Sequence, residues 1–146
     1  IETSGMDKVR CGIWQIGAYD MNTGEQFLDE SKIDAEDEIL NEPDAKKPVL
    51  EVIGKTEKEM RDSKKQSQKE MLEKFLLWVK NRKLKNFLCQ NPQFDVAFID
   101  IKAKKYGLKK TFHFRSFDLH SMFQLRYYQL NKRCWQSNCL WPESFF

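Results

Sequence analysis

The sequence predicts an α/β fold, because short segments of strand character alternate with longer segments of helical periodicity. Residues 11–20 alternate their side chains between two faces, as a strand does, whereas residues 67–81 place apolar side chains at intervals of three and four. The chain has 146 residues, of which 40% are hydrophobic and 32% charged. These values are typical of one globular domain with a substantial core.

The first elements form a predicted hairpin. Residues 21–24, Met-Asn-Thr-Gly, are a turn signal, so segments 11–20 and 25–29 are expected to pair as antiparallel strands. Residues 30–48 are polar and acidic and contain two prolines, which predicts a loop.

Two helices are expected next. Thr56 with Glu59 has the spacing of a capping box and predicts a short helix. A longer helix is predicted over residues 67–81, whose buried stripe comprises Met71, Leu72, Phe75, Leu76 and Val79.

The remaining elements continue the alternation. Residues 87–89 are a short apolar run and predict a buried strand. Pro92 then opens a helix that Gly107 ends. Residues 111–117 alternate as a strand, and Asp118 is placed to cap a last helix to about Leu130. The expected architecture is therefore a sheet covered by helices.

Charge and cysteine content narrow the function classes. The net charge is +3 and the pI is about 8.6, which is compatible with nucleic-acid binding. No apolar run approaches the roughly 20 residues of a membrane span, so no membrane association is expected. The four cysteines form no Cys-x-x-Cys pair, which favours a reducing, cytoplasmic setting.

Two separated segments carry carboxylates in settings typical of a metal site. The first six residues, Ile-Glu-Thr-Ser-Gly-Met, place Glu2 before small residues and a glycine that lets the backbone turn sharply. The second carboxylate, Asp95, ends the segment 91–95, Asn-Pro-Gln-Phe-Asp. Carboxylates that converge in a fold hold hard divalent cations. We therefore expect Glu2 and Asp95 to share one site.

These segments resemble the motifs of a known family, the DEDD 3′–5′ exonucleases. Residues 1–6 resemble the first motif of this family and residues 91–95 its second motif, while residues 13–18 are similar to its second strand. Residues 50–56 resemble the segment before its first helix, and residues 117–119 resemble a later step from strand to helix. The resemblance covers about residues 1–131.

The resemblance implies a ribonuclease H-like fold, with a mixed β-sheet flanked by helices, and a function. The family removes nucleotides from the 3′ end of single-stranded DNA or RNA with two divalent cations, Mg or Mn. Carried over to this chain, Glu2 and Asp95 are metal ligands and catalytic residues. The implied substrate-binding residues are Thr3, Gly5, Met6, Asn91 and Phe94. Expected partners are a single-stranded 3′ end and either a polymerase or a second copy of the chain.

The chain departs from the family pattern at both ends. An Asp that precedes the first motif in the family is absent, and with it most of the first strand. The final motif helix, which supplies a His or Tyr base and the last Asp, is also missing. We therefore expect an incomplete exonuclease-like domain over residues 1–131 with little activity of its own. Residues 132–146 are left as an aromatic tail without an assigned role.

Three other interpretations stay open. The first is a non-catalytic module that binds single-stranded nucleic acid through Phe94 and basic residues, namely Lys102, Lys104, Lys105, Lys109 and Lys110. The second is a protein-interaction domain that docks through the aromatic tail. The third, a zinc site from Cys134, Cys139, His113 and His120, is the weakest because tetrahedral sites favour tighter ligand pairs.

Overall fold

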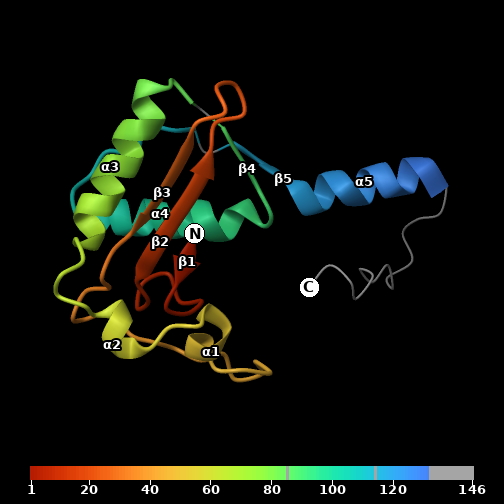
Figure 1. Ribbon diagram of the computed structural model, residues 1–146. Coiled ribbons are helices and arrows are strands. Elements are labelled where there is room, and N and C mark those ends of the chain that lie inside the picture. The colour runs from red at the N-terminus through yellow and green to blue at the C-terminus, as the bar shows by residue number, and fades with distance from the viewer. Residues whose placement is uncertain (85, 114, 132–146) are drawn as a thin grey trace.

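The computed structural model describes residues 1–84, 86–113 and 115–131, and these form a mixed α/β fold (Figure 1). The α/β class predicted from the sequence is confirmed. The described strands form two separate sheets, one of three strands and one of two. This corrects the expectation of one continuous mixed sheet.

The three-stranded sheet has the order β1-β2-β3 and is antiparallel throughout. It comprises β1 (Glu2–Thr3), β2 (Ile13–Tyr19) and β3 (Gln26–Glu30). The predicted hairpin is confirmed, with Gln15 opposite Glu30 and Tyr19 opposite Gln26. Strand β1 pairs with the first half of β2 only, where Glu2 lies opposite Gln15.

Two short helices, α1 (Val49–Ile53) and α2 (Glu57–Met60), follow the long loop after β3. The capping box predicted at Thr56 and Glu59 is present, and it begins α2. The five-residue helix α1 was not predicted. A small second cluster of buried apolar residues, which comprises Trp14, Ile33 and Met60, has Leu50 and Ile53 of α1 packed against it.

Helices α3 (Gln68–Asn81) and α4 (Pro92–Lys105) supply most of the main core. A second capping box, formed by Ser67 and Glu70, begins α3. The whole predicted stripe of α3 is buried. It packs with Ile13 and Ile16 of β2 and with Phe98 and Ile99 of α4, so both helices lie against the three-stranded sheet (Figure 1).

The second sheet pairs β4 (Phe87–Cys89) with β5 (Ser116–Asp118) in parallel. Strand β5 is shorter than the predicted segment 111–117. Phe112 is buried in the core, and the Thr111 hydroxyl donates to the carbonyl of Leu76. The start of the predicted segment is therefore held by α3 rather than by a strand.

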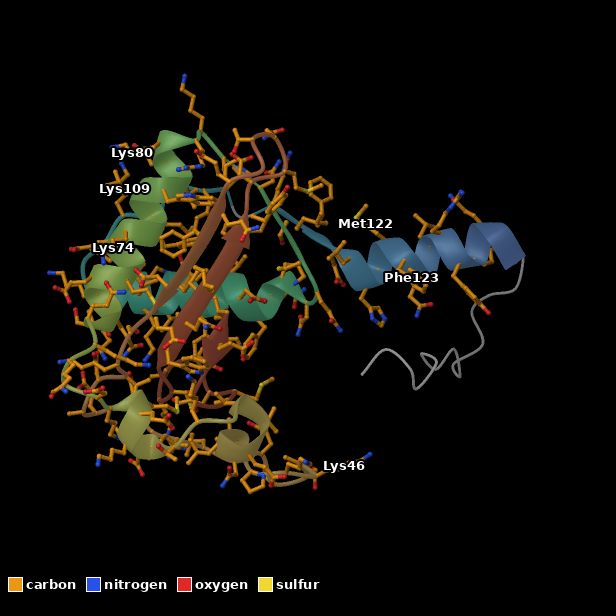
Figure 2. The ribbon with its side chains drawn as sticks, in the orientation of Figure 1. Lys46, Lys74, Lys80, Lys109, Met122 and Phe123 are labelled. Atoms are coloured by element: carbon orange, nitrogen blue, oxygen red, sulfur yellow. The ribbon has the colours of Figure 1, made fainter. Side chains whose placement is uncertain are left out.

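Helix α5 (Leu119–Asn131) follows β5 and confirms the last predicted helix. It projects away from the two sheets (Figure 1), and Met122 and Phe123 are exposed on it (Figure 2). None of the described helices is long and apolar enough to cross a membrane. The predicted aromatic tail, residues 132–146, lies outside the described residues.

Candidate functional site

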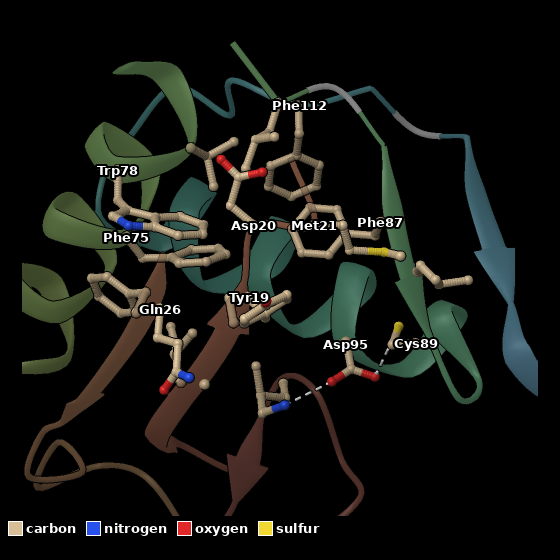
Figure 3. A pocket seen from close by; sticks show the side chains of 18 of the residues that line it. Tyr19, Asp20, Met21, Gln26, Phe75, Trp78, Phe87, Cys89, Asp95 and Phe112 are labelled. Atoms are coloured by element: carbon tan, nitrogen blue, oxygen red, sulfur yellow. Dashed lines mark hydrogen bonds and ion pairs between the residues drawn. The ribbon is translucent and has the colours of Figure 1, made fainter. Parts of the chain in front are cut away.

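The two carboxylate motifs meet at the start of the chain. The amino group of Ile1 donates to Oδ1 of Asp95 at 2.8 Å, across 94 positions of sequence (Figure 3). Asp95 lies in the first turn of α4, where the helix dipole favours a negative charge. The Ile1 side chain is only 3% exposed, so this ion pair is anchored in the core.

Glu2 follows Ile1 directly and has an exposed side chain on β1. Its backbone pairs with Gln15 of β2. The structure therefore brings the first and second motifs together through Ile1, with Glu2 one residue away from the ion pair that fixes Asp95. Glu2 is absent from the residues that line the neighbouring cavity, whereas Ile1 and Asp95 line it.

Cys89 is a neighbour of Asp95 that the sequence did not assign to the site. Its thiol donates a long hydrogen bond to Oδ2 of Asp95, with Sγ 3.8 Å from the oxygen (Figure 3). Burial, and then the negative charge of Asp95, raise the pKa of Cys89 to about 11. The thiol is therefore protonated at neutral pH and is poorly suited to act as a nucleophile there.

Asp118 is a further acid at this end of the second sheet. It ends β5 opposite Cys89 and accepts from the Ser121 hydroxyl at 2.7 Å and from the backbone N–H of Asn91 at 3.2 Å. These hydrogen bonds, the Ser121 hydroxyl first, lower the pKa of Asp118. The sequence prediction gave Asp118 a capping role only. Its position at the carboxyl end of a parallel strand was the signal for a site residue.

The residues of the first motif that were predicted to bind substrate lie in different environments. Thr3 is buried, and its hydroxyl donates to the carbonyl of Gly5 at 2.7 Å. A Cβ on Gly5 would lie 2.7 Å from the carbonyl oxygen of Leu40, so this glycine allows close packing within the chain. Met6 is 50% exposed and is the residue of this group most open to a ligand.

The residues of the second motif that were predicted to bind substrate lie at the start of α4. Asn91 is exposed and takes a left-handed backbone conformation with φ of 51°. Phe94 is half-buried, with its ring centroid 4.9 Å from that of Phe98. The Lys8 ammonium lies 5.6 Å from the Phe94 centroid, which brings the loop after the first motif to the second motif.

The described residues supply few ligands for a metal ion at this site. Within the part of the chain that the structure describes, no three residues of the His, Cys, Asp and Glu types gather as a metal site. Glu2 and Asp95 are carboxylates of the kind that Mg²⁺ and Mn²⁺ prefer. They do not make up the complete ligand set of a two-ion centre.

The basic run that motivated the alternative of a binding module is largely neutralised by acids. Lys102 is buried and its ammonium donates to Oδ1 of Asp37 at 2.7 Å. Lys104 and Lys110 both pair with Asp100, at 2.8 and 3.1 Å. Lys105 pairs with a group of acids on the loop after β3, namely Asp34, Glu36 and Asp37. The run is therefore not a continuous positive surface.

Comparison with known proteins assigns this chain to no family. No protein-family model matches this chain, and no curated protein sequence matches it.

Proposed function

We propose that this chain is part of a 3′–5′ exonuclease of the DEDD class, with a ribonuclease H-like fold, in which Glu2 and Asp95 bind divalent cations. The observation that carries the proposal is the 2.8 Å contact between the Ile1 amine and Asp95. It supports the proposal because two motifs that resemble the same family, 94 positions apart, come together in space.

The Asp95 carboxylate already holds a positive charge, the Ile1 ammonium, at one oxygen. Glu2 adds a second negative side chain one residue along β1. A metal ion would have to displace this ammonium from Asp95, and Glu2 would supply a second carboxylate of the kind that Mg²⁺ and Mn²⁺ prefer.

The described residues supply only part of what the reaction needs. When bound, Mg²⁺ or Mn²⁺ polarises a phosphodiester and lowers the pKa of a bound water. Glu2 and Asp95 would hold the ion, and Met6 and Phe94 are the substrate-binding residues that the resemblance implies in the first and second motifs. Because two acids are fewer than the family set, we expect weak metal binding and little hydrolysis by this chain.

Metal binding can be tested without relying on activity. Mn²⁺ titrated into the ¹⁵N-labelled chain should broaden the amide signals of Glu2, Cys89 and Asp95 before those of distant residues, because a paramagnetic ion acts on nearby nuclei. The variants Glu2→Gln and Asp95→Asn keep the side-chain shapes and remove the charges, so each should weaken this broadening.

Activity is the second readout. Single-turnover degradation of 5′-labelled single-stranded DNA and RNA, with Mg²⁺ or Mn²⁺, should show at most slow shortening from the 3′ end, lost in Glu2→Gln. Broadening that begins elsewhere in the chain and is unaffected by both variants would refute the proposal. Salt-sensitive binding of single strands that needs no divalent ion would instead support the non-catalytic module.

A further inference from the structure

The strand that carries Glu2 is too short to be held by its own pairing. Strand β1 comprises only Glu2 and Thr3, and its register with β2 shifts between these two residues. Strands in folded proteins usually have about five or six residues. The Glu2 side chain is exposed on this short strand, so its position depends on how the residues beside it are held.

Ser4 anchors the chain directly after β1. It is completely buried. On one side, its N–H donates to the carbonyl of Gly12, and its hydroxyl accepts from the N–H of Gly12, both at 2.9 Å. On the other side, its hydroxyl donates to the carbonyl of Glu38 at 2.6 Å, and its carbonyl accepts from the N–H of Leu40 at 2.9 Å. Ser4 therefore joins β1 to the residue before β2 and to the loop after β3.

Residues 37–40 of this loop lie along the first motif and the turn that follows it. The N–H of Glu38 donates to the carbonyl of Arg10 at 2.8 Å, and the Arg10 guanidinium donates to both oxygens of the Glu38 carboxylate. Leu40 lies against Gly5, where a Cβ would come within 2.7 Å of the Leu40 carbonyl oxygen. Segment 37–40 thus contacts the chain on both sides of the Ser4 anchor.

The first residue of this segment bonds to the helix that carries Asp95. The buried Asp37 carboxylate accepts from the Lys102 ammonium of α4 at 2.7 Å. Asp95 lies in the first turn of the same helix, seven residues before Lys102. Seven residues are about two helical turns, which places both side chains on one face of α4. Segment 37–40 therefore connects the anchor beside Glu2 to the helix of Asp95.

We propose that segment 37–40 is a brace that sets the position of Glu2 relative to Asp95, and that Ser4 is the positioning residue through which the brace acts on Glu2. This inference rests on the proposed function, because it concerns the same two metal ligands. Ligands from separate elements bind one ion well only if their separation is held. Residues that orient ligands in this way typically change metal affinity about 10–100-fold. Loosening the brace should therefore weaken metal binding although both carboxylates remain.

The variant Ser4→Ala tests the anchor without removing a metal ligand. It deletes the hydroxyl that bonds to Glu38 and keeps the main-chain carbonyl that accepts from Leu40. If the hydroxyl holds the brace in place, the Leu40 amide should exchange about tenfold faster in the variant. The Mn²⁺ concentration that half-broadens the Glu2 amide signal should rise about tenfold or more.

Two further variants make the comparison specific. Thr111→Val is the matched control, because it also deletes a hydroxyl that donates to a main-chain carbonyl, that of Leu76 at 3.1 Å, and it should leave both readouts unchanged. Glu38→Ala removes only the carboxylate that pairs with Arg10, and these side chains are 44% and 54% exposed. This variant should fold even if Ser4→Ala does not, and should shift both readouts in the same direction by up to about fivefold.

The outcomes separate the brace from a purely structural role and from the proposed function. Faster Leu40 exchange with unchanged Mn²⁺ binding in Ser4→Ala would show that Ser4 serves the fold alone and would overturn the inference. Equal changes in Thr111→Val would overturn it too, as would unchanged readouts in Glu38→Ala if Ser4→Ala does not fold. If the native chain binds no Mn²⁺ at its two acids, the proposed function fails, whereas Leu40 exchange still tests whether Ser4 holds the brace.

Discussion

Cys89 gives the most direct test of the environment of Asp95. Burial and the Asp95 charge raise the pKa of this thiol to about 11, so its thiolate fraction at pH 8 is on the order of a hundredfold below that of a free cysteine with a pKa of about 8.5. Alkylation by iodoacetamide, mapped by mass spectrometry, should be correspondingly slow at pH 8 and should accelerate as the pH rises toward 11.

The Asp95→Asn variant is the matched comparison for this prediction. It removes the negative charge and keeps the size of the side chain, so the pKa of Cys89 should fall and alkylation at pH 8 should become faster. If Cys89 of the native chain is alkylated at pH 8 as fast as in the urea-unfolded chain, the described contact with Asp95 is wrong.

Sequence reasoning proposed Glu2 and Asp95 as site residues but did not predict which residues lie beside them. Glu2 and Asp95 stand in motifs that can be recognised from adjacent residues. The contact between Cys89 and Asp95 depends on where β4 ends relative to α4, and the Asn91–Asp118 bond spans 27 positions. Such contacts arise only after the elements pack, so residue patterns along the chain do not reveal them.

The elements around the site are held in place by a buried ion pair. Lys102 of α4 donates to Asp37 in the loop after β3, and both side chains are at most 2% exposed. Asp37 also accepts from the Gln68 side chain of α3, and Gln68 in turn accepts from the Ile13 N–H of β2 at 2.7 Å. One buried carboxylate thus connects the loop, two helices and the sheet.

Removing the lysine should destabilise the fold strongly. Lys102→Met leaves the buried Asp37 charge with only the more distant Lys105 ammonium, 3.7 Å away, and we expect a loss of about 3–5 kcal/mol in the free energy of unfolding. Urea unfolding followed by circular dichroism measures this loss. The double variant Lys102→Met with Asp37→Asn removes both charges and should recover a large part of it. A loss below about 1 kcal/mol for Lys102→Met would show that the pair is hydrated.

Helices were predicted better than strands and short elements. Helices α2 and α3 both begin with capping boxes, which are local signals. The box of α2 was predicted, whereas α3 was predicted from its apolar stripe alone. Strand β5 is shorter than predicted because the alternating pattern of residues 111–117 also suits a segment whose Phe112 fills the core. Helix α1 has no side-chain cap at its start and no buried residue, and Gly54, which ends it in a left-handed conformation, was a local signal that the prediction did not use.

Four described carboxylates that accept hydrogen bonds, Glu30, Glu59, Glu70 and Asp100, have lowered pKa values. Lysine ammonium groups are the main cause at Glu30 and Asp100, and backbone amides at helix starts are the main cause at Glu59 and Glu70. A carboxylate whose pKa is lower in the folded chain stabilises the fold above its unfolded pKa of about 4. That stabilisation is lost as the pH falls through the folded pKa.

These carboxylates should therefore make the fold less stable in acid. Above neutral pH they are already ionised and should add little further stability. We expect the melting temperature to be nearly constant from pH 7 to about pH 5 and to fall progressively below it, as each carboxylate takes up a proton. Thermal unfolding followed by circular dichroism at a series of pH values measures this. Glu70→Gln can still accept a bond at the start of α3 but cannot titrate there, so its melting temperature should fall less steeply below pH 5. A melting temperature that is flat from pH 6 to pH 3 would show that these carboxylates do not couple protonation to folding.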